Sequence, residues 1–113
     1  MNEEKVKVAV ERYMRAWSAG NVHKMYKYSQ ITWKCEHKDK VLEALYNGLH
    51  LQNYEIIGIR ISGQAAAKVA VQMTINGEDV VSCVMVIAET SGYTPDPDGI
   101  YGVNPISVLQ YKI

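Results

Sequence analysis

A chain of 113 residues has the length of one domain, and its twelve basic and twelve acidic side chains give a net charge of zero at pH 7. Without a basic surplus or a run of like charge, the sequence lacks the features typical of nucleic-acid binding and of attraction to anionic membranes. No stretch approaches the roughly 20 apolar residues of a membrane span, and the N-terminus leads directly into an amphipathic pattern. We therefore expect a single cytoplasmic domain over residues 1–113 that binds neither nucleic acid nor membrane, although an exported chain trimmed of its signal would look the same.

Residues 3–50 carry the periodicity of helices. The clearest pattern is an apolar stripe with the spacing of one helical face, ending near Gly20: Val6, Val10, Tyr13, Met14 and Trp17. Asn21 and Asp39 are suitable N-caps for two shorter helices. The segment 29–37 between these two helices fits either a short strand or an irregular connection.

From residue 53 onward the apolar pattern changes to the two-residue period of strands, first at Ile57, Ile59 and Ile61. A second apolar row precedes Asn76-Gly77, a pair that favours tight hairpins because both positions need positive φ. Residues 79–89 are apolar on both faces, as in a central strand, and a last strand covers residues 100–112, with Pro105 at a bulge or an edge. The sequence therefore predicts an α+β domain with three N-terminal helices packed on an antiparallel four-stranded sheet.

This order of elements resembles the nuclear-transport-factor-2-like superfamily, which includes ketosteroid isomerases and polyketide cyclases. Residues 10–20, VERYMRAWSAG, followed by Asn21, are similar to the opening helix of that family and its turn into the second helix. Residues 54–63 and 67–71 resemble its first hairpin, and residues 101–107 resemble its closing strand. The resemblance implies a cone-shaped α+β roll whose curved sheet wraps the helices and leaves a pocket open at one end. It implies no particular reaction, because this fold hosts many unrelated functions.

The aromatic side chains are eight tyrosines and two tryptophans without any phenylalanine, and each brings a polar group that needs a partner when buried. Five of them are candidates to line a pocket in the cone: Tyr13, Trp17, Tyr26, Trp33 and Tyr54. Such a pocket would bind a small apolar or semi-polar ligand. In the alternative interpretation the same rings fill the cone and leave no pocket.

No catalytic set can be identified from the sequence. An isomerase of this family needs a carboxylate base and an acid pair, such as a tyrosine with a second, protonated carboxyl. Tyr13 is a candidate for the tyrosine, but the inward rows of the predicted strands contain no acid. His37 and Asp39 are the one local His/Asp pair, and Asp39 is explained as a helix cap. We expect catalytic residues to remain unknown and no cofactor to be required, with an isomerase, cyclase or dehydratase that uses Tyr13, His37 or Asp39 as the alternative.

The two cysteines, Cys35 and Cys83, are far apart in sequence, and we expect both to be free, small, buried side chains. Cys35, His37 and His23 could be combined into a metal site. Two soft ligands without a second closely spaced pair are a weak zinc pattern, so we expect no metal.

The central strand suggests association. If helices cover one face of the sheet only, the valines of the second face are exposed, and the residues assigned to that face are Val80, Val84 and Val86. A homodimer packed sheet to sheet would bury them. The expected function is therefore small-ligand binding or association, with the enzyme named above as the alternative.

Overall fold

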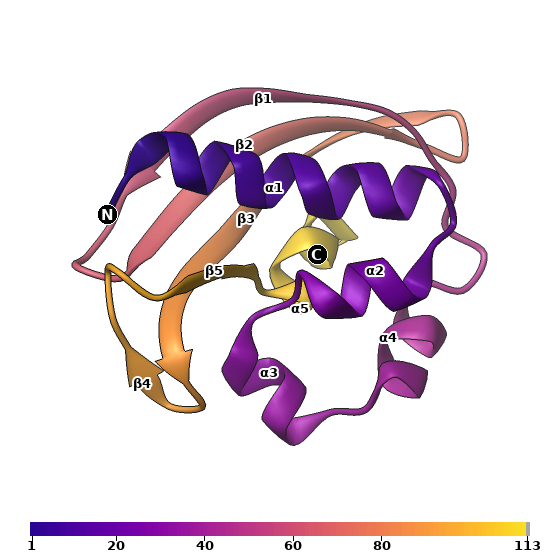
Figure 1. The fold of residues 1–113 in the computed structure, drawn as a ribbon. Coiled ribbons are helices and arrows are strands. Elements are labelled where there is room, and N and C mark those ends of the chain that lie inside the picture. The colour runs from indigo at the N-terminus through magenta and orange to yellow at the C-terminus, as the bar shows by residue number, and fades with distance from the viewer. Residues whose placement is uncertain (113) are drawn as a thin grey trace.

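A five-stranded antiparallel sheet forms one layer of the structure, which is a computed structural model describing residues 1–112. Its strands are β1 (Leu51–Ile61), β2 (Ala66–Ile75), β3 (Glu78–Ser91), β4 (Thr94–Pro95) and β5 (Ile100–Val103). The first three pair in chain order, and β3 also pairs with both β4 and β5. Figure 1 shows β1, β2 and β3 as long, curved strands.

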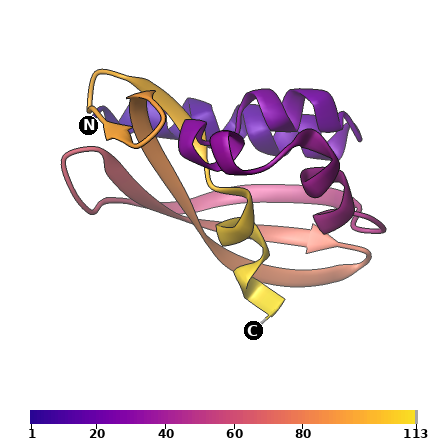
Figure 2. The same ribbon diagram turned by 90° about the horizontal axis from the view of Figure 1, so that it is seen from below.

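The second layer is helical and comes from the first half of the chain. It contains α1 (Glu3–Ser18), α2 (Val22–Lys27), α3 (Ile31–Glu36) and α4 (Asp39–Leu45). Figure 2 shows these helices on one side of the sheet. The described chain ends with two short turns that follow β5: the helical turn α5 (Pro105–Val108) and the 3-10 turn η1 (Leu109–Lys112).

The long helix α1 forms where the sequence predicts it. Asn2 caps its N-terminus, because the Asn2 Oδ1 accepts a hydrogen bond from the Lys5 backbone N–H. Every residue of the predicted apolar stripe is buried, and α1 packs against β1 and β5. The apolar stripe of α1 therefore supplies the helical half of the core.

The inward row of β2 supplies the other half of the core. Its apolar residues are all buried, as the two-residue period predicts: Ala67, Val69, Val71, Met73 and Ile75. The turn that follows is also confirmed, because Asn76 and Gly77 have φ of 51° and 82°, the positive values that a type I′ turn requires.

Two segments adopt a different structure from the one that their sequences indicated. Residues 31–36 form the helix α3, neither a strand nor an irregular connection. The last strand ends at Val103, because Asn104 and Pro105 start α5: the Asn104 side chain accepts from two backbone N–H groups, and the φ of proline suits the first helical turn. Within residues 1–112 there are thus four N-terminal helices in place of three, and the two-residue β4 makes five strands in place of four.

The faces of β3 are the reverse of the expected ones. Val84 pairs with Val69 and Val86 pairs with Ala67, so both valines share the inward face of β2 and are fully buried. Val80 pairs with Met73 and is half-buried. These three valines belong to the face that the helices cover, and the expectation of a second, exposed valine face at these positions was wrong.

Candidate functional site

The interior between the two layers is occupied by aromatic rings. Tyr13 donates a hydrogen bond of 2.8 Å to the hydroxyl of Tyr46, and Tyr46 donates one of 2.8 Å to the carbonyl of Pro105. Trp17 meets Tyr46 edge to face with ring centroids 4.9 Å apart, and its indole N–H donates to the Leu49 carbonyl. Burial raises the pKa of both tyrosines above the ordinary value, so the two hydroxyls are neutral at physiological pH.

A second aromatic cluster lies around α3. Trp33 stacks on His37 at 4.4 Å between ring centroids. The Tyr26 hydroxyl donates to the His37 carbonyl at 2.6 Å, and the Lys34 carbonyl lies 3.2 Å from the same oxygen. His37 Nδ1 lies 3.0 Å from the Trp33 carbonyl, which makes Nδ1 the protonated nitrogen. Within residues 1–112, the buried Trp33 indole N–H has no hydrogen-bond partner.

The five aromatic residues predicted to line a pocket therefore do not gather around a single cavity. Tyr13 and Trp17 meet through Tyr46, Tyr26 meets Trp33, and the half-buried Tyr54 lies on β1 opposite Met73. Trp17 also borders an open hollow of about 410 Å³ where the end of α1 approaches α4 and β1. The structure gives Tyr13 a tyrosine as its partner, and no carboxylate is hydrogen-bonded to it in the described part of the chain.

One buried acid escaped the sequence analysis. Glu89, near the end of β3, is only 2% exposed, although no acid was expected on the inward rows. One carboxylate oxygen accepts from the Thr32 backbone N–H at 3.0 Å, and the other accepts from the Thr32 hydroxyl. Both oxygens are used to hold the start of α3. In the sequence, Glu89 directly follows the apolar run that ends at Ala88. This position at the end of the strand was the signal available for its role.

None of the polar residues proposed for catalysis or metal binding is hydrogen-bonded to this carboxylate within residues 1–112. Asp39 is the exposed first residue of α4, and the residue in the N-cap position is Lys38, one place earlier than predicted. Cys35 and Cys83 are free, as expected, but both are exposed where burial was expected. Among the described residues, no three His, Cys, Asp or Glu side chains are grouped to hold a metal ion.

The sheet presents an apolar surface on the side away from the helices. We call it the outer face and define it by Ile57, Ala70, Val81, Cys83 and Met85. Val81 is 57% exposed and Ile57, beside a bulge in β1, is 53% exposed. Ala70 pairs with Cys83 in the register of β2 and β3, which places both in the middle of this surface.

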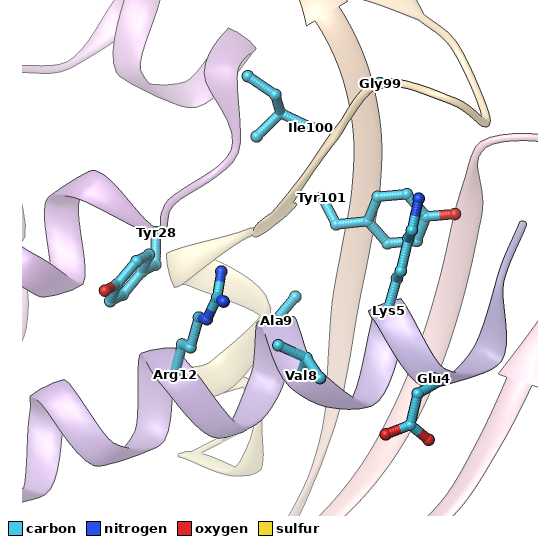
Figure 3. A pocket seen from close by; sticks show the side chains of 9 residues that line it. All are labelled: Glu4, Lys5, Val8, Ala9, Arg12, Tyr28, Gly99, Ile100 and Tyr101. Atoms are coloured by element: carbon cyan, nitrogen blue, oxygen red, sulfur yellow. The ribbon is translucent and has the colours of Figure 1, made fainter.

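A groove runs along the other side of the molecule, between α1 and β5 (Figure 3). Its volume is about 370 Å³, and its walls include Val8, Arg12, Tyr28 and Ile100. A second hollow of about 370 Å³ adjoins it, since Arg12 and Tyr28 line both. Arg15 and Lys24 add two more positive charges to the second hollow.

Comparison with known proteins adds no assignment. No protein-family model matches the chain, and no curated protein is detectably similar to it. Across residues 1–112, none of the helices has both the length and the apolar character needed to cross a bilayer. The functional proposal below therefore rests on the geometry described above.

Proposed function

We propose that the protein is an association domain that forms a homodimer through the outer face of its sheet. The observation that carries the proposal is the exposure of Val81 and Ile57, at 57% and 53%, on a sheet whose four N-terminal helices all lie on the opposite side (Figure 2). Large apolar side chains exposed together on one face are typical of protein interaction sites.

The charges around the outer face favour a second copy as the partner. Arg60 pairs with Lys68, and Glu55 pairs with Gln72, so both signs of charge lie beside the apolar residues. A two-fold interface brings one patch against the same patch of the partner, which allows a basic residue of one copy to meet an acidic residue of the other. An apolar centre with a polar border is the usual anatomy of such interfaces.

The packed interior supports association over ligand binding in the cone. Tyr13 is fully buried and Trp17 is 4% exposed, and Tyr46 lies in edge-to-face contact with both rings. This close contact of buried rings in the interior supports the proposal of association over a ligand held between them. We retain the proposal that the fold is a nuclear-transport-factor-2-like roll, supported by the order of helices before strands and by a long first helix packed across the sheet.

The test is the oligomeric state of the Val81→Lys variant. A buried, unpaired lysine at the centre of the interface would oppose association, so we expect this variant to be monomeric where the wild type is dimeric. Size-exclusion chromatography with light scattering measures the mass directly. Val41→Lys is the matched control, because Val41 is 38% exposed on α4 and lies outside the outer face.

Two results would contradict the proposal. A wild-type chain that is monomeric at concentrations of about 100 μM would have no useful self-affinity. A Val81→Lys variant that remains dimeric would place the interface elsewhere on the molecule. Circular dichroism of each variant confirms that the change acts on association and leaves the fold intact.

A further inference from the structure

We propose that the groove beside β5 and the hollow next to it form one binding site for a small organic anion. The groove would hold the apolar body of the ligand, and the hollow between α1 and α2 would hold its negatively charged group. The site lies on the helical side of the molecule, away from the outer face, so it is independent of the proposed dimer (Figure 2, Figure 3).

The half of the site beside β5 is the more apolar of the two, although Glu4, Lys5 and Arg12 also line it. Val8 and Ala9 of α1 line it together with Ile100, which is 66% exposed and therefore available for contact with a ligand. Tyr101 also lines this half, and its hydroxyl is already engaged, because it accepts from the Asn2 N–H and donates to the Pro97 carbonyl. This half thus offers hydrocarbon and an aromatic ring.

The half of the site beside α2 is cationic. Arg12, Arg15 and Lys24 line it together with the Asn21 and Tyr28 side chains. The Lys27 ammonium lies 5.8 Å from the centre of the Tyr28 ring and adds a further positive charge nearby. Figure 3 shows Arg12 and Lys5 extending from α1 toward β5, whereas the carboxylate of Glu4 extends the other way.

Within residues 1–112, the cations that line the site form no ion pair with a carboxylate, although Glu4 is part of the groove lining. Within the described chain, the one ion pair joins Lys7 to Glu11 at 4.0 Å and involves none of the cations that line the site. The zero net charge of the chain conceals this local excess, since nine of the twelve basic residues and only five of the twelve acidic residues lie in residues 1–40. An anionic ligand would supply the missing partner.

The chemistry and the size of the site together define the ligand class. Arginine forms strong, charge-assisted and often bidentate hydrogen bonds with phosphate and carboxylate groups. A bare anion would leave the apolar groove empty, and a neutral ring would leave the arginines unpaired. Each half measures about 370 Å³, within the range of small-molecule sites. A compact molecule with an aromatic or aliphatic body and one phosphate or carboxylate matches both halves.

The probe for this proposal is 1-naphthyl phosphate, with inorganic phosphate and 1-naphthol as its two separate parts. We expect saturable binding of 1-naphthyl phosphate with a Kd below about 1 mM, and binding of either part at least about tenfold weaker. Amide chemical shifts in a ¹⁵N-labelled protein report both the affinity and the location. The shifted amides should lie in residues 5–15, 21–28 and 99–101.

Matched variants test each half of the site. Arg12→Gln removes the cation shared by both hollows and should weaken 1-naphthyl phosphate at least about tenfold. Arg60→Gln makes the same change on β1, on the other layer, and should leave the affinity unchanged. Ile100→Ser should weaken 1-naphthyl phosphate and leave inorganic phosphate unaffected. All three side chains are exposed, so each variant should retain the wild-type fold.

Three outcomes would overturn the proposal. One is the absence of saturable shifts with 1-naphthyl phosphate at about 10 mM. Another is equal binding of inorganic phosphate, because the apolar groove would then contribute nothing. The third is an equal loss of affinity in Arg12→Gln and Arg60→Gln, which would indicate non-specific attraction to positive charge.

Discussion

Two tyrosine hydroxyls form a hydrogen-bond chain through the core, from Tyr13 on α1 through Tyr46 to the Pro105 carbonyl at the start of α5. This chain joins segments that are far apart in the sequence. The middle member is essential for both bonds, because Tyr46 accepts from one neighbour and donates to the other. Burial raises the pKa of both hydroxyls, which keeps them protonated and able to donate.

Removing the Tyr46 hydroxyl should therefore destabilise the protein more than removing the Tyr13 hydroxyl. Tyr13→Phe leaves Tyr46 with its bond to Pro105 and should cost about 0.5–1.5 kcal/mol of the free energy of unfolding. Tyr46→Phe leaves both the Tyr13 hydroxyl and the Pro105 carbonyl without their partner, and each unsatisfied group costs about 1–3 kcal/mol. Urea unfolding followed by circular dichroism measures the difference. Equal losses in the two variants would show that the bonds do not form a chain.

At the scale of elements, the helix α3 depends on a strand that is distant in sequence. Its N-cap residue, Gln30, makes no side-chain capping bond, and the Glu89 carboxylate of β3 takes that role by accepting from the Thr32 N–H and hydroxyl. Thr32 in turn accepts from the Tyr93 N–H in the turn between β3 and β4. A six-residue helix has little stability of its own, so α3 depends on tertiary contacts such as this one.

The Glu89→Ala variant should release α3 from the sheet. It leaves the Thr32 N–H and hydroxyl without acceptors, and we expect a loss of about 1–3 kcal/mol in the free energy of unfolding. Relative to the wild type, amide hydrogen exchange in this variant should accelerate more at residues 31–36 than in β2. Glu89→Gln is the control, because its side-chain amide oxygen can still accept from Thr32. Its free energy of unfolding should lie between those of Glu89→Ala and the wild type. Unchanged protection in Glu89→Ala would assign the stability of α3 to the stacking of Trp33 on His37 alone.

At the scale of the whole molecule, the two layers present different chemistry to their surroundings. The outer face is apolar and lies on the sheet, whereas the proposed anion site is cationic and lies among the helices and β5. The two free thiols are divided between these sides. Cys83 is in the middle of the outer face, and Cys35 lies in α3 beside Gly92 of the turn between β3 and β4.

This division allows an independent test of the dimer. Association through the outer face should protect Cys83 from alkylation by iodoacetamide, while Cys35 stays reactive at every concentration. We expect the ratio of modified Cys83 to modified Cys35, measured by peptide mass spectrometry, to fall as protein concentration rises and to recover in Val81→Lys. A ratio that does not change with concentration would argue against this interface.

Local patterns were enough for the elements whose partners are near in sequence. The apolar stripe of α1, the inward row of β2 and the turn at Asn76-Gly77 were predicted and are confirmed, because helix and strand periods and positive φ are local properties. The division into helices followed by an antiparallel sheet follows from the same patterns. The sequence indicated the five aromatic residues as candidates for one pocket. It did not predict that they would be divided between separate clusters.

The sequence by itself determined the fold class and the core positions of α1 and β2, and only the tertiary structure decided which face each residue of β3 presents. That strand is apolar on both sides, so its own pattern carries no register; its pairing with β2 turns Val84 and Val86 inward and leaves Val81 outside. The role of Glu89, the helical state of residues 31–36 and the convergence of Arg12, Arg15 and Lys24 beside Tyr28 likewise arise from contacts between distant segments. Long-range pairing and capping decide such features, and a local pattern contains no information about them.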